Sequence, residues 1–445
     1  MSATGFEIAD RLLALAAKAG AQATVNVREA RTGNVRFAAG EITTAGEASS
    51  AETTLSMSFG ARHATSSTNQ VDEASLRALA DRTAALARIA PEDPEFLPPL
   101  GPERYPESTH AWDEATSAID PRWRASAARA AIARAEEKSL VAAGFVETMA
   151  VEATLATSAG LRADHRATLV RMTTTARTRD GKGSGWAGAE ATRAADLDAS
   201  ALARVAADRA ERSHDATKLD PGRYTVVLEP AAVADLLSFL MGALDARAAD
   251  QGRSFFSRGS GGNRVGEALF DPRVILRSDP LDPGTPGCPF DGDGIPLSPR
   301  TWIDRGKLEN LYYSRFWAKS AGRAPSGAYA TWTLSSAAPG APSAAALAEN
   351  VHRGLLVTRF WYTRWLDRKQ VLVTGLTRDG VFLIEDGRIT RPVNNFRFND
   401  SPVKMLSRLV GMTAQTFCTP SGGAVVRVPI VCCDDFEMAS VSDAV

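Results

Sequence analysis

The sequence predicts an α+β protein, with an N-terminal sheet-and-helix region followed by a mainly antiparallel β domain that forms a sheet or a partial barrel. Two observations support this prediction. Up to residue 220, segments with alternating polar and apolar residues are interspersed with segments that carry apolar residues at helical spacing. After residue 250, strand-like segments dominate and helical patterns are scarce.

The first unit begins with a helix, because Ile8 and Leu12 lie on one side of an amphipathic segment. Residues 21–66 contain three strand-like segments. Asp72 or Glu73 then caps a second helix with an apolar side. These elements indicate a first α/β unit over residues 1–92.

A proline-rich linker over residues 93–120 separates this unit from a middle α/β unit over residues 121–220. The middle unit has a helix from about Trp123 to Lys138, two strands and a helix that begins at Asp198. Strands followed by such a helix therefore occur twice, which is consistent with a diverged repeat of one unit.

The C-terminal domain covers residues 221–445. It begins with a short apolar strand, Tyr224–Leu228, and a helix with Pro230 in its first turn. Residues 255–299 are rich in Gly, Pro and Asp and read as largely irregular. Several hairpins, a short helix near residues 402–409 and a last strand complete the domain.

One hairpin is especially clear. Val381–Glu385 alternates at period two, and Asp386-Gly387 suits a type I′ turn before the returning strand Arg388–Val393. Just before it, Thr377–Gly380 reads as a charged turn between two apolar strands. Binding functions often lie in such loops, so this turn is a candidate site, and a surface turn with a local ion pair is the structural alternative.

Composition excludes several functions. The 445-residue chain has a net charge of −1 and a pI near 6.6, which favours neither a nucleic-acid partner nor a membrane surface. No apolar run approaches the length of about 18 residues that crosses a bilayer. The acidic N-terminal residues do not suit a secretory signal, and the four cysteines form no CxxC pair. We therefore expect a reduced, cytoplasmic protein.

Most short motifs are weak. The five histidines are too far apart in sequence to suggest a metal site. Asp291-Gly-Asp293 begins like a calcium loop but has Pro296 where an EF-hand needs glycine. Gly183-x-Gly185-x-x-Gly188 matches the dinucleotide fingerprint, but it follows a polar segment and opens no helix. Neither calcium nor nucleotide binding is predicted.

The segment 359–365 combines arginines with aromatic residues. Such a combination suits a peptide or carboxylate ligand. The alternative is a strand buried on both sides, with one arginine paired to an acid. Alternation would divide these residues into two faces: Arg359, Trp361, Thr363 and Trp365 on one, and Phe360, Tyr362 and Arg364 on the other.

Several segments in the same order resemble the TldD/PmbA family over nearly the whole chain. They are PGRYTVVLEPAAVADLLSFL (221–240), GRSFFSRGSGGNRVGEALFDPRV (252–274), CPFDGDGIP (288–296), LENLYYSRFWAKSAG (308–322) and GLTRDGVFLIEDGRITRPVNNFRFND (375–400).

This resemblance implies a peptidase-related function. TldD-type subunits carry a zinc-binding HExxxH motif on the helix after the YTVVL-like strand, with a cysteine near the C-terminus as a further ligand. Here the corresponding stretch, residues 237–243, has neither His nor Glu, although Cys418 lies near the position of the family's cysteine. The chain therefore resembles the TldE (PmbA) side of the family, the non-catalytic partner.

The implied assembly is a heterodimer with a TldD-like catalytic subunit that carries the zinc, with no cofactor in this chain. It would cleave unfolded or leader peptides inside a chamber, where the peptide adds as a strand. We expect Arg378 and Asp379 to bind peptide, with Arg315 and Arg364 as carboxylate partners.

Two other functions remain open from the sequence. The first is a homodimeric peptide-binding or assembly protein without protease activity. The second is a self-sufficient hydrolase with an unconventional site built from Asp245, Asp250 and Cys418.

Overall fold

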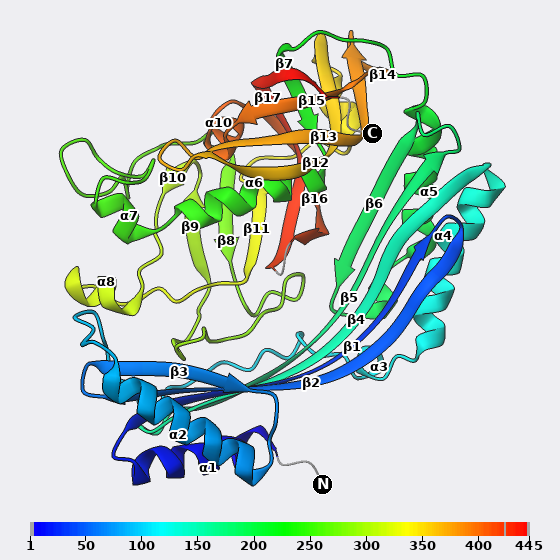
Figure 1. The fold of residues 1–445 in the computed structure, drawn as a ribbon. Helices are drawn as coiled ribbons and strands as arrows, with labels where there is room; N and C mark the ends of the chain where they lie inside the picture. Colours follow the sequence, from blue (N-terminus) through cyan, green and yellow to red (C-terminus); the bar gives the residue numbers. More distant parts are fainter. Residues whose placement is uncertain (1–3, 422–423, 443–445) are drawn as a thin grey trace.

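A computed structural model describes residues 4–421 and 424–442. It contains a six-stranded N-terminal sheet with helices and a C-terminal domain built on an 11-stranded sheet (Figure 1). This architecture confirms the predicted α+β class, with a mainly antiparallel C-terminal domain.

The N-terminal sheet combines strands from both predicted α/β units. Its order is β3-β2-β1-β4-β5-β6, with every neighbouring pair antiparallel. The strands are β1 (Gln22–Ala38), β2 (Glu41–Phe59), β3 (Arg62–Thr68), β4 (Leu140–Thr157), β5 (Arg162–Thr178) and β6 (Ser184–Ala191). Pairing of β1 with β4 therefore joins the two units into one sheet.

Two helices flank the strands of each unit. They are α1 (Gly5–Lys18) and α2 (Glu73–Ile89) in the first, and α4 (Pro121–Glu137) and α5 (Ala199–Arg212) in the second. Asp72 and Asp198 cap α2 and α5, accepting the N–H groups of Ser75 and Ala201. The helix–three strands–helix order occurs twice, and the helices lie on the convex side of the curved sheet (Figure 1).

Two separate apolar clusters lie between this sheet and its helices, one for each helix pair. The first includes Ile8, Leu12 and Leu76, and the second includes Val146, Met172 and many small alanines. The segment between the units has one short helix, α3 (Glu114–Ser117). Each helix pair thus buries its apolar side against its own end of the sheet.

The C-terminal domain contains a closed ring of five strands. These are β7 (Gly222–Leu228), β12 (Arg353–Asp367), β13 (Leu372–Glu385), β15 (Asn395–Asp400) and β17 (Ala424–Ser442). The ring closes because β17 pairs with both β15 and β7. Phenylalanine rings pack together in this domain, with Phe360 4.1 Å from Phe398 and 5.9 Å from Phe436 between centroids.

The remaining elements extend or cover this ring. The additional strands are β8 (Val274–Ser278), β9 (Arg300–Asp304), β10 (Lys307–Leu308), β11 (Thr331–Ser336), β14 (Arg388–Pro392) and β16 (Leu409–Ser421). The helices are α6 (Pro230–Ala243), α7 (Ala246–Asp250), α8 (Arg315–Ser320), α9 (Ala344–Ala348) and α10 (Pro402–Ser407), and a 3₁₀ turn (Ala194–Asp196) precedes α5. In the described ranges, no helix is long and apolar enough to cross a bilayer.

The hairpin between β13 and β14 confirms the turn prediction. Asp386 and Gly387 have φ values of 46° and 80°, as a type I′ turn requires. Val381 and Leu383 enter one apolar cluster, while Phe382 and Ile384 enter another, so both faces of this strand are buried.

The prediction of a charged turn at Thr377–Gly380 is wrong. These residues lie inside β13, where Asp379 and Gly380 together face Thr358 and form a β-bulge. Asp379 has φ 57° and is 1 % exposed. The Thr358 hydroxyl lies 3.0–3.2 Å from three carbonyl oxygens of this bulge. A pairing between distant residues therefore replaces the expected surface turn.

The strict alternation predicted for residues 359–365 is also wrong. The register of β12 against β13 shifts between Trp361 and Arg364, and Tyr362 has φ 58°. As a result, the adjacent side chains of Trp361 and Tyr362 are both exposed. A β-bulge inserts one extra residue, so it reverses the alternation of the residues that follow.

Candidate functional site

Helix α6 follows β7 and lies against β12. Leu237 and Leu240 face the core, and the Ser238 hydroxyl donates to the carbonyl of Asp235 at 2.7 Å. The Phe239 ring meets the Trp365 ring edge-on, with centroids 4.9 Å apart. Phe239, on the less buried side of this helix, therefore packs against an aromatic residue of β12.

Asp235 is the acidic side chain of α6 and lies near Arg359. Burial raises the pKa of Asp235 to about 7, and the positive charge of Arg359 partly opposes this shift. A carboxyl group that titrates near neutral pH is a feature of many functional sites. Nothing in the sequence pattern distinguished this residue from an ordinary helix aspartate.

Asp379 is the centre of a polar network. Its Oδ2 atom lies 2.7 Å from Nε of Arg359 and 4.0 Å from Nε of Arg378. Its Oδ1 atom accepts a short hydrogen bond from the hydroxyl of Ser184. Because Ser184 belongs to β6, this network connects the N-terminal sheet with the C-terminal domain.

A second set of contacts also joins the N-terminal region to the C-terminal domain. Arg209 of α5 donates to the carbonyl of Trp186 at 2.7 Å and pairs closely with Glu229, the residue that precedes α6. Burial raises the pKa of Glu229, and Arg209 opposes the rise. The Arg359 guanidinium also lies 4.9 Å from the Trp186 ring centre. The region between β6, α5 and α6 is thus a charged, desolvated seam.

A cavity of about 280 Å³ opens beside this seam, and its lining includes Lys182, Ser184, Asp379, Asn394 and Asn395. Its lining combines these polar side chains with apolar ones, among them Val381 and Val393.

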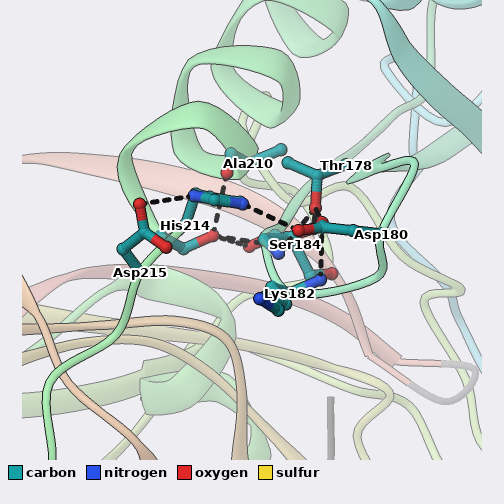
Figure 2. Close-up of polar contacts among 9 residues, drawn as sticks. Thr178, Asp180, Lys182, Ser184, Ala210, His214 and Asp215 are labelled. Atoms are coloured by element: carbon teal, nitrogen blue, oxygen red, sulfur yellow. Dashed lines mark hydrogen bonds and ion pairs between the residues drawn. The ribbon is translucent and has the colours of Figure 1, made fainter.

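The rim of the cavity is fixed by the turn between β5 and β6 (Figure 2). Asp180 accepts from the Thr178 hydroxyl at 2.6 Å, from the backbone N–H of Lys182 at 3.1 Å and from His214 at 3.0 Å. His214 also lies 2.8 Å from Asp215. These two carboxylates raise the pKa of His214 and connect the turn to the end of α5.

The four predicted peptide-binding residues lie in three places. Arg378 and Asp379 are neighbours at the seam, and Arg378 lies 4.9 Å from the Trp361 ring centre. Arg364 is exposed further along the same hairpin, 5.6 Å from the Tyr362 ring centre.

Arg315 lines a different cavity, of about 370 Å³, between the N-terminal sheet and α8. Its Nη2 atom donates to the carbonyl of Pro98 at 2.6 Å. His63 and Asp93, 3.0 Å apart, line the same cavity. The structure therefore brings together only Arg378 and Asp379 from the predicted set.

The residues of the unconventional hydrolase hypothesis do not form one site. Asp245 caps α7 by accepting the N–H of Ala248, and Asp250 accepts from Asn263 and Trp317, each at 2.7 Å. Cys418 lies on β16, where its thiol donates to the carbonyl of Gly284 at 3.4 Å and burial raises its pKa. Among residues 4–421 and 424–442, no group of three or more His, Cys, Asp or Glu could hold a metal ion.

Sequence reasoning missed Ser184, Arg209 and Asp235, which all belong to the seam. A signal was present in the glycine pattern, because a Cβ atom on Gly185 would lie 2.2 Å from the carbonyl oxygen of Ala206. The pattern that mimics a dinucleotide fingerprint lies mostly in β6 and permits close packing of that strand against α5.

Comparison with known families identifies the chain. Residues 221–440 match the family model described as PmbA/TldA metallopeptidase C-terminal domain, and residues 115–213 match the PmbA/TldA metallopeptidase central domain. The chain belongs to the PmbA/TldD family. A comparison with curated proteins found no match.

Three solved structures share this PmbA/TldD fold. TldE from Thermococcus kodakarensis is 16% identical, with a TM-score of 0.87 over 97% of this chain and 99% of that chain. A proposed modulator of a DNA gyrase from Thermotoga maritima is 18% identical, with a TM-score of 0.83 over 98% and 100% of the two chains. A second proposed modulator of DNA gyrase, from Bacteroides thetaiotaomicron, is 21% identical, with a TM-score of 0.83 over 97% of this chain and 98% of that chain.

Membership of a metallopeptidase family raises the question of whether α6 could hold zinc. Zinc binds imidazole, thiolate or carboxylate groups. In the stretch 237–243, Phe239 packs on Trp365, and the Ser238 hydroxyl is engaged with its own helix. The residues present in this stretch do not fit a zinc ion.

Proposed function

We propose that this chain is a non-catalytic, TldE-like subunit of a TldD/TldE-type metalloprotease. Its partner would be a TldD-like chain that carries the zinc, and the pair would cleave unfolded or leader peptides in a shared chamber in the cytoplasm. The proposal rests chiefly on α6, whose outer side meets an aromatic ring at the stretch where a peptidase of this family would need metal ligands.

Peptide contacts belong to the same proposal. Arg378, Arg315 and Arg364 would meet carboxylates of the peptide, since a guanidinium binds a carboxylate through two parallel hydrogen bonds. Asp379 is enclosed, so it would act by holding Arg359 and Arg378 in position. The less buried side of α6 would then form one wall of the chamber.

Co-expression with an HExxxH-bearing relative from the same genome tests this proposal. We expect the two chains to elute together and to cleave an unfolded peptide, with activity lost to a chelator and restored by zinc. The matched control is the same complex with glutamine in place of the partner's motif glutamate, which should assemble without cleaving.

Two outcomes would contradict the proposal. Zinc-dependent cleavage by this chain alone would make it a catalyst in its own right. A stable homodimer that ignores every zinc-bearing relative would favour the alternative of a peptide-binding or assembly protein without protease activity.

A further inference from the structure

Residues 361–371, which are the end of β12 and the turn that leads into β13, form an arm of the C-terminal domain. This arm carries several exposed large side chains. Trp361 is 44% exposed, Tyr362 69% and Leu366 54%, within six consecutive residues. Large apolar groups that gather on a surface commonly mark a binding site, whereas isolated ones need no explanation.

Backbone strain coincides with the most exposed of these side chains. Tyr362 has φ 58°, a strained conformation that a bulky residue rarely adopts. It lies in the bulge where Tyr362 and Thr363 together face Gly375. A glycine would satisfy this bulge without strain, so the fold alone does not explain the exposed tyrosine.

The charge of the arm indicates what it would bind. From residue 361 to residue 371 there are three cationic side chains, Arg364, Arg368 and Lys369, and one carboxylate, Asp367. That carboxylate is engaged in the turn, where it accepts the N–H groups of Lys369 and Gln370. The exposed end of the arm is therefore positive in a chain whose net charge is −1.

Two arginines of the arm are arranged for an incoming ligand. Arg364 and Arg368 lie over the rings of Tyr362 and Trp365, at 5.6 and 5.2 Å, and both are exposed. Neither has an ion-pair partner among residues 4–421 and 424–442. Stacking occupies the face of a guanidinium, so its N–H groups remain available for a carboxylate.

We infer that this arm captures unfolded peptides through acidic side chains, with Arg364 and Arg368 binding the carboxylates and Tyr362 supplying a rigid apolar contact. The inference rests on the proposed function in that the ligand is its peptide substrate, and it narrows that substrate to acidic sequences. Binding by the arm does not require the zinc-bearing partner.

Fluorescence anisotropy with the full chain and a fluorescein-labelled hexaglutamate peptide tests the inference. We expect saturable binding that weakens with salt, because exposed charge pairs are screened. The variant Arg364→Gln/Arg368→Gln should weaken binding about tenfold or more. The control Arg122→Gln/Arg129→Gln on α4 removes the same charge from another exposed surface and should leave binding unchanged.

A third variant separates binding from folding. Tyr362→Gly relieves the strained backbone and removes the ring, so it should raise the melting temperature while weakening peptide binding. A defect caused by misfolding would change both quantities in the unfavourable direction.

Three results would overturn the inference: no binding of hexaglutamate by the wild type, equal loss of binding in the α4 control, or equal affinity for hexalysine.

Sedimentation velocity provides a further check. A dimer that the Arg364→Gln/Arg368→Gln variant dissociates would assign the arm to contact between copies of the chain. Failure of this inference would leave partner-dependent cleavage of a neutral peptide intact, so it is distinguishable from failure of the proposed function.

Discussion

At the scale of single residues, Asp379 shows how a bulge changes the role of a charged side chain. Its carboxylate is buried and is surrounded by Arg359, Arg378 and Ser184. Removing one member of a buried ion pair leaves the other charge desolvated and unpaired. Nε of Arg359 and Oδ2 of Asp379 have no hydrogen-bond partner among the described residues, so their contact is an ion pair, and each charge depends on the other.

Substitution of this carboxylate tests that account. Asp379→Asn should lower the free energy of unfolding by about 3 kcal/mol, because Arg359 keeps its charge without a partner. Urea denaturation measures this loss.

The double variant Arg359→Met/Asp379→Leu should recover most of the stability lost in Asp379→Asn, since apolar groups can replace a buried ion pair at little cost. A double variant that is no more stable than Asp379→Asn would contradict the account.

His214 makes a pH-dependent contribution to folding stability at the rim of the cavity beside the seam. Its pKa is raised by hydrogen bonds to Asp180 and Asp215. The stabilisation from a raised histidine pKa is fully present below the unfolded value of about 6.5 and is lost as the pH rises through the folded value. The melting temperature of the wild type should therefore exceed that of His214→Asn by more at pH of about 6 than at pH of about 9. A difference that stays constant or grows with pH would rule out this contribution.

At the scale of elements, local chemistry predicted much of the structure. Asp72 and Asp198 begin their helices, and Asp386-Gly387 forms the expected turn, because each depends on neighbouring residues alone. The bulges at Tyr362 and Asp379 could not be predicted this way. Each depends on which residue of a distant strand lies opposite, and that register is set by long-range pairing.

Packing of β6 against α5 also belongs to this scale. Gly185→Ala should lower the free energy of unfolding by about 2–3 kcal/mol, because the new Cβ atom would lie 2.2 Å from a backbone oxygen of α5. Chemical denaturation measures the effect. Gly259→Ala is the matched control, since nothing lies within 4 Å of its Cβ position, and a loss of equal size there would refute the packing argument.

At the scale of the whole molecule, two features were beyond the sequence. The two α/β units share one sheet through β1 and β4, and the ring of the C-terminal domain closes through β17 and β7. Both pairings join residues that are far apart in the chain, so no local pattern encodes them. The contacts among Ser184, Asp379, Arg209 and Glu229 in the seam depend on these long-range pairings. For this reason the predicted peptide-binding set contained only two residues of the seam, Arg378 and Asp379 of β13.

The central claim is the proposal that residues 237–243 of α6 stand where a peptidase of this family would hold zinc, a stretch that contains no His, Cys, Asp or Glu. Zinc content of the purified chain, measured by mass spectrometry after exposure to zinc and dialysis, tests this claim most directly. We predict far less than one zinc ion per chain. One tightly held zinc ion per chain, lost when Asp235 or Cys418 is replaced, would contradict it.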